Sequence, residues 1–312
     1  MSTSASASAS APGKIILLGE HSVVFGAPAI AAAIDRRLEV RVRFDDGPPA
    51  SSDAKLQRAV AVAAHDLELD PARLAIEVAS DIPPACGLGS SAALSLALVR
   101  ALASLSGRAL ADGEIHARAS RVEDVFHGTA SGVDVAASAS GGVVWFERSN
   151  PPRIEPLRPA RSVDLVVGMS GDPRSTAGPV ARLRDRHAKR PELYGRLFQL
   201  AGDVVRAGRE ALEAGDWETL GTLMDTAQGL LNAFGVSTPA LERMVAVARG
   251  AGALGAKLSG AGGGGVIIAL APSSAVRVAE ALRAAGFEAF CTRIGPATPQ
   301  EVEDAKSNRR SA

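Results

Sequence analysis

One stretch constrains the fold of this chain more than any other: Asp81-Ile-Pro-Pro-Ala-Cys-Gly-Leu-Gly-Ser-Ser-Ala-Ala93. Its prolines favour an extended start, Gly87 and Gly89 permit a tight turn, and Ser90 is placed to cap an apolar helix over 91–105. A glycine turn that enters a helix presents unpaired N–H groups and a partial positive charge, which suit a phosphate. The stretch is neither a Walker A loop nor a full dinucleotide fingerprint, so alone it could be an ordinary loop before a buried helix.

Two further glycine-marked motifs accompany this stretch. Ala11-Pro-Gly-Lys-Ile-Ile-Leu-Leu-Gly-Glu-His-Ser-Val-Val-Phe-Gly26 holds a short apolar strand between Lys14 and the pair Glu20 and His21. Lys257-Leu-Ser-Gly-Ala-Gly-Gly-Gly-Gly265 precedes a second apolar strand. Charged residues beside a buried strand usually mark a solvated end, but three glycine motifs in one chain favour a functional site.

The size and charge of the chain exclude several classes of protein. Its 312 residues are enough for two domains. Its formal net charge is zero and its basic residues are scattered, which argues against a nucleic-acid partner. No apolar run reaches the roughly 18–20 residues of a membrane helix, and no secretory signal pattern opens the chain. Cys86 and Cys291, far apart in sequence, indicate free thiols, so we expect a cytoplasmic protein.

Strands and helices mix in both halves of the chain. Predicted strands or apolar segments cover 15–18, 29–34, 38–44, 74–79, 143–146, 163–168, 266–270 and 287–294. Predicted helices cover 53–67, 91–105, 112–126, 179–213 with breaks, 216–234, 239–250 and 274–285. The segment 148–161, rich in proline and arginine, is predicted to be a linker. We therefore expect a disordered tail over 1–10, an N-terminal domain over 11–155, a C-terminal domain over 156–304 and a loose tail over 305–312.

Polar residues of four loops supply the parts of one kind of chemistry: Lys14, Glu20 and His21; Ser90 and Ser91; Glu123 with Asp134; and Ser259. Phosphoryl transfer to a hydroxyl needs a phosphate cradle, a Mg²⁺ ion with few protein ligands, a base and a cation. Ser91 and Glu123 would suffice for Mg²⁺. An aspartate could take the hydroxyl proton, and a neighbouring lysine would keep it ionised. The inventory favours a nucleotide-dependent transferase, while spacing alone leaves open whether these loops meet.

The three motifs, in this order, resemble those of the superfamily of galactokinase, homoserine kinase, mevalonate kinase and phosphomevalonate kinase, the GHMP kinases. Three segments are similar to the mevalonate kinase family in particular: Glu20-His21 with the following Val-Val-Phe-Gly, His127-Gly-Thr-Ala-Ser-Gly-Val-Asp134, and Leu231-Asn-Ala-Phe-Gly-Val-Ser237. The resemblance runs from Ala11 to about Ile294. It implies an α+β, two-lobed GHMP kinase fold, with an ATP-binding N-terminal lobe of the ribosomal protein S5 domain 2-like type and a ferredoxin-like C-terminal lobe.

The same resemblance implies an activity and the roles of individual residues. The implied activity is ATP-dependent phosphorylation of the C5 hydroxyl of (R)-mevalonate to 5-phosphomevalonate, in the mevalonate route to isoprenoids. Mg²⁺ is the implied cofactor and a homodimer is the expected assembly. Asp134 would be the catalytic base, with Lys14 beside it, and Ser91 and Glu123 would hold Mg²⁺. The residues implied to bind ATP are Lys14, Ala85, Cys86, Gly87, Leu88, Gly89, Ser90 and Ser91. The residues implied to contact mevalonate are Glu20, His21, Asp134, Thr176, Gly260 and Ala261.

Three departures from the family pattern keep alternatives open. Ala130 stands where proline is usual, Val135 replaces an asparagine after the catalytic aspartate, and Val266 stands where cysteine is common. Val135 puts the shape of the acceptor pocket in question, so a kinase for phosphomevalonate, a sugar or another small alcohol is the first alternative. A non-catalytic nucleotide-binding sensor and a mevalonate diphosphate decarboxylase are the others. The retention of Lys14, Ser91, Glu123 and Asp134 together argues against the sensor. The Glu-His pair argues against the decarboxylase.

Overall fold

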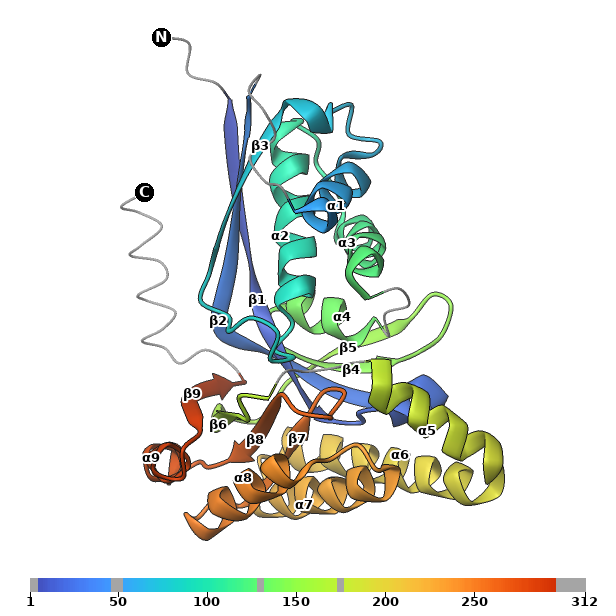
Figure 1. The fold of residues 1–312 in the computed structure, drawn as a ribbon, viewed down its shortest axis with the longest axis vertical. Helices are drawn as coiled ribbons and strands as arrows, with labels where there is room; N and C mark the ends of the chain where they lie inside the picture. Colours follow the sequence, from blue (N-terminus) through green and yellow to red (C-terminus); the bar gives the residue numbers. More distant parts are fainter. Residues whose placement is uncertain (1–4, 46–52, 128–131, 173–176, 296–312) are drawn as a thin grey trace.

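The computed structural model describes residues 5–45, 53–127, 132–172 and 177–295. They form two lobes, each built of a β-sheet with helices packed on it (Figure 1). The upper lobe in that view holds the first part of the chain, and the lower lobe holds the rest from β6 onward. This mixed architecture matches the α+β, two-lobed fold that the sequence motifs imply.

The N-terminal sheet is built around one long hairpin. Strands β1 (Ser6–Leu18) and β2 (Ala29–Phe44) pair antiparallel along most of their length. Strand β3 (Leu74–Ser80) pairs with the C-terminal half of β2, residues 38–44. Strand β4 (Val143–Glu147) pairs with the first residues of β2, 29–32, and β5 (Arg153–Leu157) pairs with β4. The β1–β2 pairing shifts register on either side of Lys14, between Pro12 and Lys14 and between Ile16 and Leu18. Such irregularities bend a strand and re-aim its side chains.

Several local predictions are wrong at this sheet. Residues 6–10 belong to β1, so the disordered tail predicted over 1–10 does not extend that far. Their small side chains carry no apolar signal, but the backbone pairs with β2. The segments predicted at 29–34 and 38–44 form one continuous strand. The predicted linker over 148–161 contains β5, so the N-terminal sheet ends at Leu157 and the next sheet begins at Val163.

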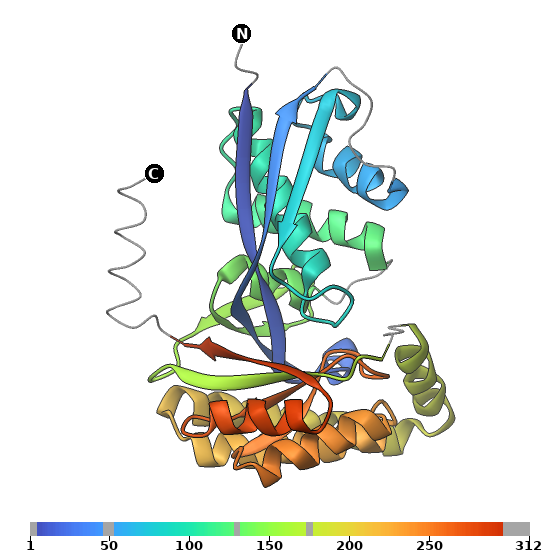
Figure 2. The same ribbon diagram turned by 60° about the vertical axis from the view of Figure 1, so that its left-hand side comes forward.

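Four helices among the described residues belong to the N-terminal lobe: α1 (Ala54–Ala64), α2 (Ser90–Leu105), α3 (Asp112–His127) and α4 (Val133–Ser140). Helix α2 lies directly on β1 and β2, with α1 and α3 packed on its outer side (Figures 1 and 2). Its alanine, leucine and valine side chains are almost all buried, which lets the helix approach the sheet closely. Asp53, predicted to be the first residue of a helix over 53–67, is the N-cap residue of α1. Gly89 rather than the predicted Ser90 is the N-cap residue of α2.

The C-terminal sheet has the strand order β7-β8-β6-β9, with all neighbours antiparallel. Its strands are β6 (Val163–Met169), β7 (Gly255–Ser259), β8 (Val266–Leu270) and β9 (Glu288–Ile294). Its helices are α5 (Ala177–Lys189), α6 (Pro191–Ala214), α7 (Trp217–Phe234), α8 (Pro239–Gly250) and α9 (Ala275–Ala284). Two helical crossovers around the β7–β8 hairpin give the ferredoxin-like arrangement, with α5 to α8 filling the first crossover.

Hydrogen bonds from side chains of the C-terminal lobe join it to the N-terminal lobe. The hydroxyl of Ser259, at the end of β7, accepts a hydrogen bond from the N–H of Ile16 at 2.9 Å and donates one to its C=O at 3.1 Å. Thr292 on β9 donates to the Asp35 carboxylate on β2 at 2.8 Å. These contacts bring the first and third glycine motifs together, although 243 residues separate Ile16 from Ser259.

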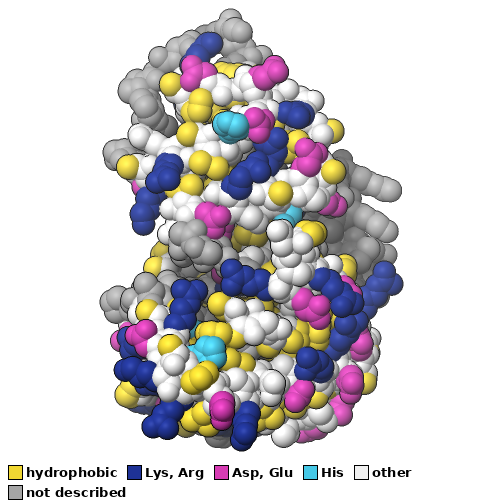
Figure 3. Space-filling view, turned by 90° about the vertical axis from the view of Figure 1, so that its right-hand side faces the viewer, with side chains coloured by type: hydrophobic (Ala, Val, Ile, Leu, Met, Phe, Trp, Pro, Cys, Tyr) yellow, Lys and Arg dark blue, Asp and Glu magenta, His cyan; other side chains and the backbone are white. Residues whose placement is uncertain are grey.

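The surface carries charges of both signs. On the face shown in Figure 3, the described Lys and Arg side chains are interspersed with Asp and Glu side chains and apolar patches. This distribution agrees with the zero formal charge of the chain. In the described part of the chain, no helix is long and apolar enough to span a membrane.

Close packing of α7 against the start of β7 depends on Gly221, which faces Gly255, and this contact generates a stability prediction. A Cβ added to Gly221 would lie 2.5 Å from the carbonyl oxygen of Leu254, whereas one added to Gly229, on the same helix, would meet nothing within 4 Å. We expect Gly221→Ala to lower the free energy of unfolding by about 1–3 kcal/mol through overpacking. The control Gly229→Ala should raise it by about 0.5–1 kcal/mol, because alanine favours a helix. Urea unfolding of both variants measures this difference, and equal stabilities would contradict the packing described.

Candidate active site

The phosphate-loop candidate adopts the conformation its glycines suggest. Gly87 and Gly89 have φ values of 88° and 79°, and Ala85 also lies in the left-handed region at 58°. Gly89 is the N-cap residue of α2, a helix of 16 residues, so the loop feeds directly into the unpaired N–H groups of that helix. The loop therefore presents backbone donors and the positive end of the helix dipole at one point, which is a suitable environment for phosphate oxygens.

Lys14 lies against this loop because two glycines leave room for it. A Cβ on Gly89 would lie 2.7 Å from Cγ of Lys14, and a Cβ on Gly13 would lie 2.8 Å from the carbonyl oxygen of Leu88. The N–H of Lys14 donates to that same carbonyl at 2.8 Å. Backbone contact between β1 and the phosphate loop thus fixes the lysine at the N-terminus of α2.

Lys14 and Asp134 form an ion pair at this place. The Nζ of Lys14 is 2.9 Å from Oδ1 of Asp134, and the lysine side chain is 1% exposed while the aspartate is 32% exposed. Asp134 lies in the first turn of α4, after Gly132 with a φ of 87°. The buried ammonium thus lies directly against a carboxylate that stays partly open to solvent. The aspartate can therefore meet a small molecule from solvent while the lysine holds it.

Glu123 joins Ser91 in a second polar cluster. Ser91 donates to Oε1 of Glu123 at 2.8 Å, and Ser95 donates to Oε2 at 3.3 Å. Burial and, to a smaller extent, the nearby charge of Asp134 raise the pKa of Glu123 to about 7. The hydroxyls and Lys14 act in the opposite direction. Helix α2 thus carries Ser91 and α3 carries Glu123 to one position, where their oxygens suit a small hard cation such as Mg²⁺.

The small number of protein ligands also suits Mg²⁺. The described residues contain no group of three or more His, Cys, Asp or Glu side chains that could form a dedicated metal cage. Mg²⁺ does not need one, because it usually keeps several waters and binds one or two carboxylates together with substrate phosphates. The repulsion between Glu123 and Asp134, which raises the pKa of Glu123, is a further feature that a cation would relieve.

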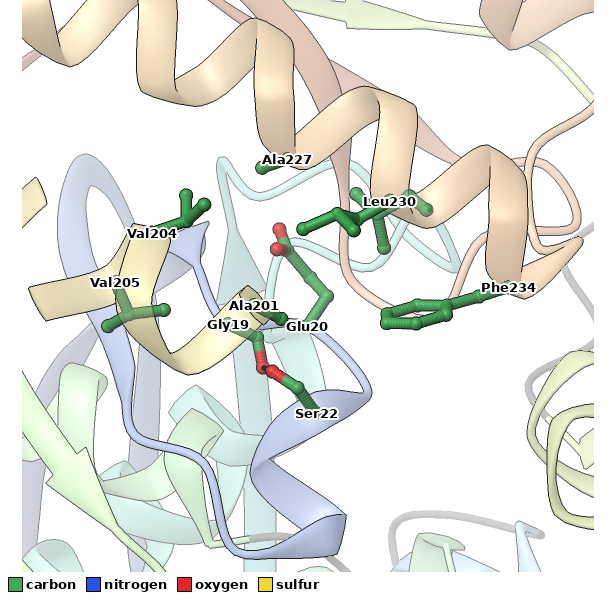
Figure 4. Close-up of a pocket in the computed structure, with 10 residues that line it drawn as sticks. Gly19, Glu20, Ser22, Ala201, Val204, Val205, Ala227, Leu230 and Phe234 are labelled. Carbon is green, nitrogen blue, oxygen red and sulfur yellow. Dashed lines mark hydrogen bonds between the residues drawn. The ribbon is translucent and has the colours of Figure 1, made fainter. Parts of the chain in front are cut away.

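Glu20, predicted to contact the substrate, lies in a buried ion pair that the motifs do not predict. Its side chain is 1% exposed, and its carboxylate forms an ion pair with the fully buried Nζ of Lys257. In Figure 4 this carboxylate points toward Ala227 of α7, among apolar side chains of the C-terminal lobe. In this conformation Glu20 belongs to the contact between the lobes and presents no surface to a substrate.

The third glycine motif lies opposite His21. The Nε2 atom of His21 is 3.0 Å from the carbonyl oxygen of Ala261. Gly260 is buried and Ala261 is half-buried. Gly262 has a φ of 70°, and a Cβ there would lie 2.2 Å from the carbonyl oxygen of Val236, so only glycine fits. The structure therefore brings His21, Gly260 and Ala261 together, as the motif analysis expects.

Other predicted residues have simpler outcomes. Cys86 is half-buried in the phosphate loop, and its thiol donates to the carbonyl oxygen of Pro84 at 3.3 Å. Val135 is 1% exposed, so it packs in the core and does not shape a pocket directly. Thr176 and Ala130 lie outside the described residues.

Two functional candidates were missed by the motif analysis. Ser95 lies one helical turn beyond Ser91 and shares its partner Glu123. Lys257 opens the third motif but was given no role, although a lysine within an apolar strand needs a buried partner. The signal for Ser95 was its i+4 spacing from Ser91 on a helix, and the signal for Lys257 was a charge in the segment that precedes a glycine loop.

Comparison with known proteins places this geometry in a family. The family description "GHMP kinases N terminal domain" matches residues 54–142, and "GHMP kinases C terminal" matches residues 209–288. The chain is 37% identical to a mevalonate kinase of Thermococcus gammatolerans, over 92% of this chain and 95% of that protein. It is 41% identical to a mevalonate kinase of Methanothermobacter thermautotrophicus, over 88% and 93%.

Solved structures agree with the sequence comparison. The L. major mevalonate kinase in complex with R-mevalonate superposes with a TM-score of 0.84 at 32% identity, covering 93% of this chain and 96% of that one. A phosphomevalonate kinase of Streptococcus pneumoniae superposes with a TM-score of 0.77 at 19% identity, over 92% and 99%, a likeness of fold alone. Sequence and structure together show that the chain belongs to the GHMP kinases and, within them, to the mevalonate kinase family.

Proposed function

We propose that this chain transfers the γ-phosphoryl group of ATP to the C5 hydroxyl of (R)-mevalonate, giving ADP and 5-phosphomevalonate. The observation that carries the proposal is the 2.9 Å ion pair of Lys14 and Asp134 beside the phosphate loop. Membership of the mevalonate kinase family supports the choice of acceptor, since a relative of this fold is known with R-mevalonate bound.

Asp134 acts as the general base in this proposal. It is 32% exposed, so an acceptor hydroxyl can reach its carboxylate, and proton transfer to it frees the oxygen that attacks the γ-phosphorus. Lys14 holds the Asp134 carboxylate in place before transfer. Its ammonium then stabilises the negative charge that develops on the attacking oxygen and the transferred group.

Backbone donors of the phosphate loop hold the ATP phosphates. The loop Ala85 to Ser91 would supply N–H groups, and the start of α2 would supply its dipole. Ser91 and Glu123 would hold Mg²⁺, which neutralises charge on the β- and γ-phosphates when it is bound. His21, Gly260 and Ala261 would line the acceptor side, together with Thr176. We further propose that the protein is located in the cytoplasm and assembles as a homodimer.

A different acceptor is the second candidate. The sequence suggested it because Val135 replaces an asparagine, but the buried position of Val135 means that its effect on the pocket is indirect. The assignment to a small alcohol other than mevalonate, such as phosphomevalonate or a sugar, therefore has less support than mevalonate itself. A panel of alcohol acceptors with ATP separates the two, because a preference for another alcohol would exclude the first.

The first prediction concerns the base. We expect Asp134→Asn to lower kcat about 10²–10⁴-fold, because the acceptor hydroxyl loses its proton acceptor. The Kd for ATP should stay within about threefold, since the phosphate loop is untouched. The control is Asp203→Asn, a 70% exposed residue in a surface pair of α6, which should leave kcat unchanged. Retained turnover in Asp134→Asn would remove this residue from the role of base.

The second prediction concerns pH and Mg²⁺. Because the pKa of Glu123 is raised to about 7, this carboxyl gains a proton as the pH falls through neutrality and then ligates a cation poorly. We expect the free Mg²⁺ needed for half-maximal activity to rise by up to about tenfold per unit as the pH falls below 7. In Glu123→Gln that requirement should be higher and should lose its pH dependence. A flat Mg²⁺ requirement between pH 6 and 8 in the unaltered enzyme would contradict this role.

A further inference from the structure

Lys257 is a buried lysine to which the catalytic mechanism gives no part. It lies on β7 with no exposed surface, and its Nζ binds the Glu20 carboxylate and the carbonyl oxygen of Leu258, the latter at 2.7 Å. Its partner Glu20 is 237 residues away in sequence and follows β1 in the other lobe. The pair therefore joins the third glycine motif to the first.

The surroundings of this pair are apolar. Figure 4 shows the Glu20 carboxylate directed between α6 and α7, toward Ala227 and Leu230, with Val204 and Val205 on the opposite wall. Burial raises the pKa of Glu20 and lowers the pKa of Lys257, and each charge offsets that effect on the other. Lys14 adds a smaller stabilising charge on Glu20. Lys257 is thus the principal charged partner of the Glu20 carboxylate.

The residues next to the pair make further contacts between the two lobes. His21 follows Glu20 and has a φ of 60°, a left-handed conformation that is unfavourable for a residue other than glycine. Its Nε2 is 3.0 Å from the carbonyl oxygen of Ala261, four residues after Lys257. The Ser259 hydroxyl, between them, pairs with the backbone of Ile16. One short segment of each lobe is therefore fixed to the other at successive points.

A buried ion pair has a physical effect that an apolar contact lacks. Replacing both charges by apolar or neutral groups is often neutral for stability, while removing one of them leaves the other unpaired and is strongly destabilising. A buried ion pair does, however, favour one geometry, because either charge is costly to bury unless it stays in hydrogen-bonding contact with the other. Gln228 helps to fix the backbone next to Lys257, since its Oε1 accepts a hydrogen bond from the N–H of Leu258 at 2.9 Å.

We propose that Lys257 is a positioning residue for the acceptor: by holding Glu20 in the lobe interface, it fixes the strained turn at His21 against the carbonyl of Ala261 and so sets the shape of the acceptor pocket. Neither Lys257 nor Glu20 touches the acceptor. The inference rests on the proposed function, because the pocket it shapes is the one assigned to mevalonate.

The test compares the unaltered enzyme with the double variant Glu20→Gln/Lys257→Met, which removes both charges and keeps the side-chain sizes close. Thermal unfolding and ATP titration report on the fold and on the phosphate loop, and steady-state kinetics report on the acceptor. We expect a melting temperature close to that of the unaltered enzyme and a Kd for ATP within about twofold. The KM for mevalonate should rise about tenfold or more, because the turn at His21 is no longer held in place.

A matched control uses another ion pair that holds the same strand. Arg249 and Asp225 are 2.7 Å apart, and Asp225 accepts from the N–H of Ala256, the residue before Lys257. The variant Arg249→Met/Asp225→Asn should leave the KM for mevalonate unchanged, even where it lowers stability. An increase in KM equal to that of the first double variant would show a general loosening of β7 and would overturn the proposal.

The remaining outcomes also decide. A Glu20→Gln/Lys257→Met protein that does not fold would show that the pair serves stability, and an unchanged KM would show that it has no effect on the pocket; both overturn the inference. The proposed function is tested separately by the unaltered enzyme. If that enzyme uses another alcohol and not mevalonate, the assignment of acceptor fails, and the same KM ratio measured with that alcohol still tests Lys257.

Discussion

The close contact between β1 and the phosphate loop is the constraint on which the rest of the site depends. Lys14 lies 2.7 Å, at its Cγ, from the place where Gly89 would carry a Cβ, and its N–H is bonded to the carbonyl of Leu88. Any side chain at Gly89 would separate the lysine from the N-terminus of α2. Because glycine is present, one point receives the lysine ammonium, the helix dipole and the unpaired N–H groups that phosphate chemistry requires.

Two lysine–carboxylate pairs differ in their exposure to solvent: one lies within the N-terminal lobe and the other joins the two lobes. In the pair of Lys14 and Asp134 the carboxylate is 32% exposed, so it can exchange its partner for a substrate hydroxyl and take up a proton. In the pair of Lys257 and Glu20 both side chains are buried, at 0% and 1% exposure. A pair shut off from solvent is poorly suited to reacting with an acceptor, but it is well suited to fixing geometry. We therefore propose that the same chemical groups serve catalysis in the first pair and positioning in the second.

Sequence predicted the local elements and most of the site, because glycine and charged residues leave strong local signals. The approach of Lys14 to Asp134 and of Ser91 to Glu123 was expected from the motif resemblance and is found in the structure. The burial of Glu20 against Lys257 was not predicted, because the two residues are distant in sequence and no local pattern links them. Strand residues Ser6 to Ser10 were missed since their pairing with β2 is tertiary and their small side chains have no strand preference.

The central claim is that this arrangement transfers a phosphoryl group to the C5 hydroxyl of mevalonate. The most direct measurement follows ADP release and product formation together, with Mg·ATP and (R)-mevalonate, using phosphorus NMR to locate the new phosphate. The account predicts one 5-phosphomevalonate for each ADP, with no release when mevalonate is left out. Release of ADP without a phosphorylated C5 oxygen, or transfer to a different alcohol in preference to mevalonate, would contradict it.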